Sequence, residues 1–205
     1  MLTEQQFNQL KDEGYTHIPF QREVLADFDT PLSTYCKLAR QPFTYLLESV
    51  QGGEKWGRFS IIGLPNSTRL EVHEKTIRIL KSNTVVEEWQ SEDPLADIKA
   101  FHEKFRMPSF EEMPKFTGGL VGYFGYDTVR YIEPTLAAGR KPKEYEIPDI
   151  CLMVSDEVVV FDNLSGRLFI VIHVDVTQGE NRETGIRRLN ELAKQLKAPI
   201  PSRPA

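Results

Sequence analysis

Two apolar runs near the end of the chain, separated by a short polar turn, constrain the fold more than any other feature. The runs Glu157–Phe161 and Arg167–Val174 are rich in β-branched residues and flank the polar turn 162–166. This pattern is typical of a β-hairpin. Residues 158–161 and 168–172 are apolar at every position. Since apolar residues on both faces of a strand require cover on both sides, we expect this hairpin at the centre of a sheet.

The rest of the chain repeats the arrangement of short strands joined by polar turns. Further strands are predicted at residues 15–20, 43–47, 59–63, 70–80 with a turn at 74–75, 84–89, 118–126 and 150–154. Helices are predicted at residues 3–13, 30–40, 93–105, 127–132 and 180–197. Strands that follow one another in hairpins, with a few flanking helices, indicate an α+β fold with mostly antiparallel sheet.

Several predicted helices begin at residues that cap helix N-termini. Thr3 with Gln6 matches a capping box, Thr30 directly precedes Pro31, and Asp127 precedes a short apolar segment. We expect the helix that starts at Pro31 to bury its apolar side chains, which are Leu32, Tyr35, Cys36, Leu38 and Ala39.

The glycine-rich string GGLVGYFGYD at residues 118–127 is a candidate for a phosphate-binding loop. Neither the GxGxxG spacing nor a following Gly-Lys-Ser/Thr is present, so both nucleotide fingerprints fail. Glycines between bulky residues favour a strand that another backbone or a bulky ring approaches closely. We therefore assign this string a structural rather than a catalytic role.

Composition excludes several functional classes. The chain has 205 residues, enough for one or two domains, and a net charge of −5 without a basic patch, which argues against nucleic acid or an anionic membrane as a partner. The N-terminus is polar, and no apolar run approaches the roughly 20 residues of a membrane span. The cysteines, Cys36 and Cys151, lie far apart and are expected to be reduced and buried. We expect a soluble, cytoplasmic protein.

The sequence contains no pattern that indicates catalysis or metal binding. No HExxH and no GxSxG is present, and the acidic pairs are adjacent in sequence, which in a strand directs them to opposite faces. The four histidines are scattered at His17, His73, His102 and His173. We therefore predict no catalytic residue and no metal site in this chain.

The stretch from Pro42 to Gly63 is the best candidate for a binding site. A carboxylate and a hydroxyl, Glu48 and Ser49, end one apolar run, and a loop with Lys55 and Arg58 leads into the next. A carboxylate, a guanidinium and an apolar slot together can hold a zwitterionic amino acid. The alternative is an ordinary hairpin end whose charges are solvated.

Three strings resemble the N-terminal portion of anthranilate synthase component I, the large subunit that makes anthranilate from chorismate. They are LLES followed by GGEKWGRFSIIG, then GGLVGYFGYD, and PDICLMVSDEVVVFDN, within a similarity over residues 7–196. The resemblance implies that GGLVGYFGYD packs in the core of the N-terminal portion. The resemblance implies that Glu48 binds the ammonium of the feedback inhibitor L-tryptophan, Ser49 orients it, and Arg58 lies near its carboxylate. The full set of tryptophan-binding residues implied is Leu47, Glu48, Ser49, Arg58, Phe59, Ser60 and Ile61.

The resemblance also implies what this chain lacks. Residues 1–197 correspond to an N-terminal domain, and residues 198–205 form a proline-rich tail or linker. Members of the family are carbon–oxygen lyases. Their chorismate site, with its Mg²⁺-binding carboxylates, lies in a C-terminal domain. A glutamine amidotransferase subunit, component II, supplies the ammonia. We therefore expect an inactive segment that carries half of an allosteric site and binds tryptophan with millimolar affinity or not at all. The alternatives are the corresponding portion of aminodeoxychorismate synthase component I and a stand-alone amino-acid-binding or scaffold module.

Overall fold

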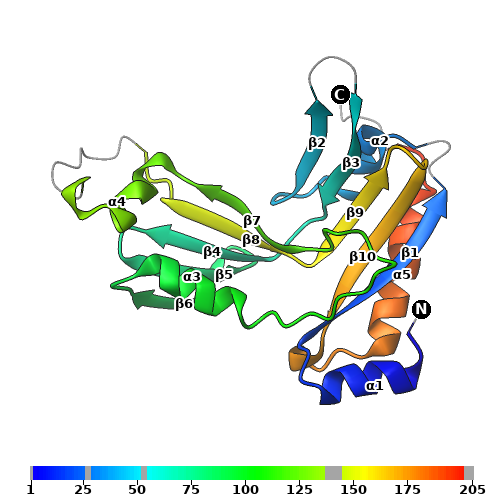
Figure 1. The fold of residues 1–205 in the computed structure, drawn as a ribbon, viewed down its shortest axis with the longest axis horizontal. Coiled ribbons are helices and arrows are strands. Elements are labelled where there is room, and N and C mark those ends of the chain that lie inside the picture. The colour runs from blue at the N-terminus through cyan, green and yellow to red at the C-terminus, as the bar shows by residue number, and fades with distance from the viewer. Residues whose placement is uncertain (1, 26–28, 52–54, 137–144, 201–205) are drawn as a thin grey trace. The chain divides into compact units, whose positions relative to one another are not determined.

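A computed structural model describes residues 2–25, 29–51, 55–136 and 145–200, and these residues form two compact units. The first unit contains the described parts of residues 1–66, 105–118 and 155–205, and the second those of residues 67–104 and 119–154. Each unit is built around one five-stranded sheet. With ten strands in two antiparallel sheets and five α-helices, the described residues confirm the predicted α+β fold (Figure 1).

The sheet of the first unit has the strand order β1-β10-β9-β3-β2. Its strands are β1 (His17–Leu25), β2 (Tyr45–Gln51), β3 (Lys55–Gly63), β9 (Glu157–Asp162) and β10 (Arg167–Asp175). The hairpin of β9 and β10 is central, and both of its faces are covered, as its sequence predicts. One face packs in a large cluster that includes Val159 and Ile170, and the other in a small cluster of Val158, Val160 and Val171.

Three α-helices belong to the first unit, and the first two begin where their predicted caps place them. They are α1 (Glu4–Asp12), α2 (Pro31–Leu38) and α5 (Arg182–Leu196). Capping boxes are present at Thr3 with Gln6 and at Thr30 with Ser33. α5 buries Leu189, Leu192 and Leu196, and all three belong to the large cluster.

Two local predictions for the first unit are wrong. Leu32 in α2 is 62% exposed, because the helix buries Thr34 and Leu38, four residues apart, and Leu32 lies on the opposite side. The strand predicted from Phe43 begins only at Tyr45, since Phe43 adopts a positive φ of 61° that breaks the extended backbone. A third prediction, that both cysteines are buried, is also wrong, because Cys36 in this unit and Cys151 in the second unit are half-buried.

The sheet of the second unit has the order β6-β5-β4-β8-β7 and carries one longer helix, α3 (Pro94–His102), which Asp93 caps. Its strands are β4 (Thr68–His73), β5 (Thr76–Lys81), β6 (Thr84–Gln90), β7 (Gly119–Phe124) and β8 (Ile150–Ser155). The predicted tight turns are confirmed. Glu74, Ser82 and Asn83 have positive φ angles at these two turns, a conformation that hairpin turns often require.

The glycine-rich string forms β7, and its backbone approaches β8 as predicted. A Cβ atom on Gly122 would lie 1.9 Å from the carbonyl oxygen of Cys151, so that no larger residue fits. The prediction of a core position is wrong, because β7 lies at the edge of its sheet and exposes Tyr123 and Phe124. Nor does Asp127 cap a helix. It lies within the short 3₁₀ turn η1 (Tyr126–Thr128), before α4 (Val129–Ile132), and accepts a hydrogen bond from Arg130 Nε at 3.0 Å.

Candidate functional site

A hollow of about 500 Å³ lies on the hairpin of β2 and β3, where the sequence predicts a binding site. Six of the seven predicted residues line it, namely Leu47, Glu48, Ser49, Arg58, Phe59 and Ile61. The seventh, Ser60, is not among the lining residues. It is 3% exposed, and its hydroxyl accepts a hydrogen bond from Asn163 Nδ2 at 3.2 Å. The structure therefore brings six of the predicted side chains to one surface.

The pairing of β2 with β3 is irregular where three consecutive residues of β2 border the hollow. In a regular strand, neighbours such as Glu48 and Ser49 point to opposite faces. Here Glu48 pairs with Ser60 but Val50 pairs with Trp56, so β3 contains more residues than β2 in this interval and the regular alternation across the pair is interrupted. Gly57 accommodates the resulting close approach, since a Cβ atom there would lie 2.0 Å from the carbonyl oxygen of Ser49.

The cation of the hollow, Arg58, is held by a carboxylate that the sequence did not indicate as part of the site. Arg58 Nε lies 3.2 Å from Asp162 Oδ1, and Arg58 Nη2 lies 3.0 Å from Asp162 Oδ2. The guanidinium carbon is 4.9 Å from the centre of the Phe59 ring, within the range of a cation–π contact. The hydrogen bond from Arg58 holds the pKa of the Asp162 carboxyl below its usual value, so this group stays ionised at neutral pH.

The turn that follows Asp162 also supports the hairpin. The backbone N–H of Asn163 donates to the carbonyl oxygen of Arg58 at 2.8 Å, and its side-chain amide donates to the carbonyl oxygen of Gly57 at 3.1 Å. The sequence places Asp162 and Asn163 in a hairpin turn but does not reveal their role. That role follows from the pairing of β3 with β9, in which Phe59 lies opposite Asp162.

The chemistry of this hollow suits binding rather than catalysis. It combines an exposed carboxylate, Glu48, with an ion-paired guanidinium and three apolar side chains. Among the described residues, no group of three or more His, Cys, Asp or Glu side chains could hold a metal ion. None of the helices in the described part of the chain has the length and apolarity of a membrane-spanning segment.

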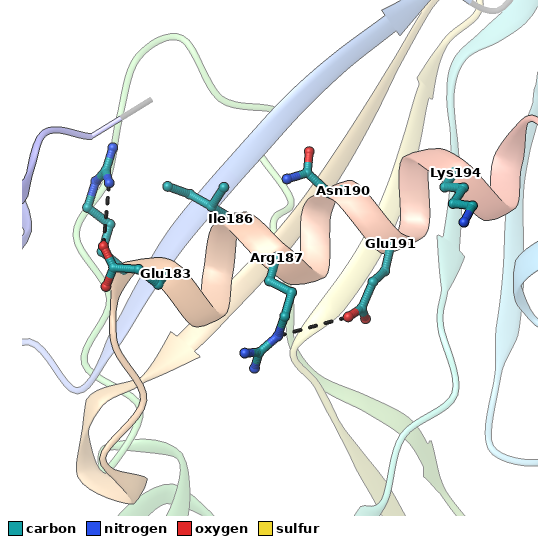
Figure 2. A pocket seen from close by; sticks show the side chains of 7 residues that line it. Glu183, Ile186, Arg187, Asn190, Glu191 and Lys194 are labelled. Atoms are coloured by element: carbon teal, nitrogen blue, oxygen red, sulfur yellow. Dashed lines mark ion pairs between the residues drawn. The ribbon is translucent and has the colours of Figure 1, made fainter.

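A second hollow, of about 440 Å³, lies along the outer face of α5 (Figure 2). All of its lining residues belong to that one helix, and they are Arg182, Glu183, Ile186, Arg187, Asn190, Glu191 and Lys194. Four of its charged side chains form ion pairs within the helix, Arg182 with Glu183 at 3.8 Å and Arg187 with Glu191 at 3.9 Å. A single helical wall with exposed ion pairs is a solvated surface, and we assign it no ligand.

Comparison with known proteins finds the same family that the three strings resemble. No protein-family profile matches the chain. Anthranilate synthase component 1 of Pseudomonas putida is 49% identical over 202 residues, which are 98% of this chain and 41% of that protein. The same component of Neisseria gonorrhoeae is 44% identical over 96% of this chain and 40% of its own length. The chain is similar to anthranilate synthase component 1.

The fold of the chain is also similar to that of a solved protein structure. Anthranilate synthase component I of Streptococcus pneumoniae TIGR4 matches 87% of this chain and 37% of its own chain, with a TM-score of 0.53 and 23% sequence identity. At this level of identity the match concerns the fold alone. The chain spans about two fifths of the length of the curated anthranilate synthase relatives that it matches.

Proposed function

We propose that this chain is the N-terminal, regulatory portion of an anthranilate synthase component I and contributes part of a feedback site for L-tryptophan. The observation that carries the proposal is the hollow on the β2–β3 hairpin, which gathers six of the residues that the family resemblance implies. The similarity to anthranilate synthase component 1 over 98% of the chain supports the family.

Each part of the hollow has a proposed role. Glu48 accepts hydrogen bonds from the ammonium group of tryptophan, Ser49 orients that group, and Arg58 binds the α-carboxylate. Leu47, Phe59 and Ile61 contact the indole ring. Leu47 is 49% exposed, so these side chains cover only part of a ring that gains most of its binding energy from burial. We therefore propose an affinity near 1 mM, which corresponds to about −4 kcal/mol.

We propose that the catalytic activity resides in the C-terminal domain of the complete subunit. We propose that the complete subunit converts chorismate and glutamine or ammonia to anthranilate in tryptophan biosynthesis, as a cytoplasmic carbon–oxygen lyase. The C-terminal chorismate-binding domain would hold Mg²⁺, and component II would supply ammonia. Residues 1–197 would form the N-terminal domain, inactive alone, and residues 198–205 the linker. Tryptophan would inhibit by favouring an inactive conformation, with a coupling free energy of about 1–3 kcal/mol.

The Glu48→Gln variant tests the proposed ammonium contact. A hydrogen bond to a charged group contributes more than a neutral one, so wild-type protein should bind tryptophan about tenfold more tightly than indole-3-propionate, which lacks the ammonium. In E48Q the two affinities should become nearly equal. Saturation-transfer NMR titrations measure both ligands at millimolar concentrations. Glu87→Gln, the same change at an exposed residue of the other unit, is the control. If E48Q kept the full preference for tryptophan, Glu48 would not be the ammonium partner.

A further inference from the structure

We propose that Asp162 is a positioning residue of this site, which fixes the Arg58 guanidinium so that its outer edge can receive the carboxylate of an amino acid. The inference rests on the proposed function, because it concerns the same ligand. It adds a residue that contacts no ligand itself and that belongs to a different hairpin, β9–β10.

The contact between the two side chains occupies one edge of the guanidinium. A guanidinium carries five N–H donors and can hold a carboxylate through the Nε–Nη2 edge or through the Nη1–Nη2 edge. Asp162 engages Nε and Nη2, at 3.2 Å and 3.0 Å. The Nη1–Nη2 edge therefore remains for a second carboxylate. The Arg58 side chain is 59% exposed and borders the hollow, so a ligand in the hollow can reach it.

Asp162 is itself held firmly, which a positioning role requires. Its side chain is only 8% exposed, and its Oδ1 accepts a hydrogen bond from the backbone N–H of Leu164 at 3.1 Å. The Asn163 backbone N–H also holds the carbonyl oxygen of Arg58 at 2.8 Å, so both the backbone and the side chain of Arg58 are fixed by the same turn. A long side chain that is already ordered loses less conformational entropy when it binds a ligand.

An opposite effect of Asp162 is also physically reasonable and can be measured. A carboxylate close to Arg58 could repel a ligand carboxylate or compete with it for the guanidinium. Removal of the Asp162 charge would then strengthen the binding of tryptophan. The positioning role requires instead that removal weakens it, and only for ligands that carry a carboxylate.

The Asp162→Asn variant separates these two effects. The amide keeps an Oδ1 atom that can accept from Leu164 N–H, so the turn is retained while the ion pair with Arg58 is lost. We expect the affinity for tryptophan to fall about fivefold to tenfold, and the affinity for tryptamine, which lacks the carboxylate, to stay unchanged. Saturation-transfer NMR titrations measure both. Glu23→Gln is the matched control, since it removes the partner of Arg167, an exposed arginine of the same sheet.

The possible results of this experiment distinguish failure of the site from failure of the positioning role. If wild-type protein shows no saturable binding of tryptophan, the proposed function fails. If wild-type protein binds tryptophan but D162N binds it equally or more tightly, the function stands and the positioning role of Asp162 is overturned. Equal weakening of tryptophan and tryptamine also overturns it, because that result indicates a general loss of structure. Asp162→Ser, whose hydroxyl can also accept from Leu164 N–H, repeats the test if D162N does not fold.

Discussion

Replacing Leu189 by alanine should lower the free energy of unfolding by about 2–5 kcal/mol, the range for large-to-small changes at buried sites. Leu189 lies in the middle of α5, is fully buried, and belongs to the cluster that covers one face of the first sheet. The same cluster contains Leu168 and Ile170 of β10, which lies between β1 and β9 in the sheet. Because strands on both sides of β10 hold it in place, the sheet cannot collapse into the space that the substitution leaves.

Urea unfolding followed by circular dichroism measures this loss. Leu164→Ala is the matched control, because Leu164 lies in the turn after β9 and is 80% exposed. The control should change the free energy of unfolding by less than about 0.5 kcal/mol. Equal stabilities of L189A and L164A would contradict the placement of α5 against the sheet.

Acidification should destabilise the protein through His173 by about 3 kcal/mol between pH 6.5 and pH 4. His173 lies in β10 and is 8% exposed, and burial lowers the pKa of its imidazole to about 4 from 6.5. Its Nδ1 donates to the carbonyl oxygen of Asp156 at 3.1 Å, whereas the buried Nε2 has no hydrogen-bond partner. A proton on Nε2 would therefore be a buried charge without an acceptor.

The direction of this change in stability follows from the pKa of His173, which is about 4 in the folded chain and 6.5 in the unfolded chain. Above pH 6.5 both the folded and the unfolded chain carry a neutral His173. Between pH 6.5 and pH 4 the unfolded chain binds a proton that the folded chain does not, so stability falls as the pH falls.

Comparison with a His173→Gln variant isolates this contribution from the other titrating groups. Burial also lowers the pKa of His17, and because the charge of His17 contributes to the lowered pKa of His173, the difference between the two proteins includes this interaction. The difference in unfolding free energy between wild type and H173Q should therefore change by about 3 kcal/mol between neutral pH and pH 4. A constant difference would show that His173 titrates normally in the folded protein.

Local sequence signals were sufficient to predict most elements of the fold. The capping boxes depend on residues three positions apart, and the tight turns of the second sheet depend on two or three residues each. The apolar runs of β9 and β10 require burial on both faces wherever they lie, and so predict a central position.

The features that the sequence did not predict depend on pairings between distant segments. No local sequence pattern predicts that β3 pairs with β9. This pairing brings Asp162 next to Arg58. The edge position of β7 and the exposure of its aromatic residues likewise depend on which strand it joins. Within the candidate site, the sequence and the family resemblance identified the lining residues, whereas the turn that holds them became evident only in the structure.

The most direct test of the proposed tryptophan site is a titration of the ¹⁵N-labelled 205-residue chain with L-tryptophan, followed by backbone amide chemical shifts. We predict saturable shifts at residues 47–49, 58, 59 and 61, which line the hollow on the β2–β3 hairpin, with a dissociation constant near 1 mM. Absence of shifts at about 10 mM tryptophan, or shifts confined to α5, would contradict a tryptophan site on this hairpin.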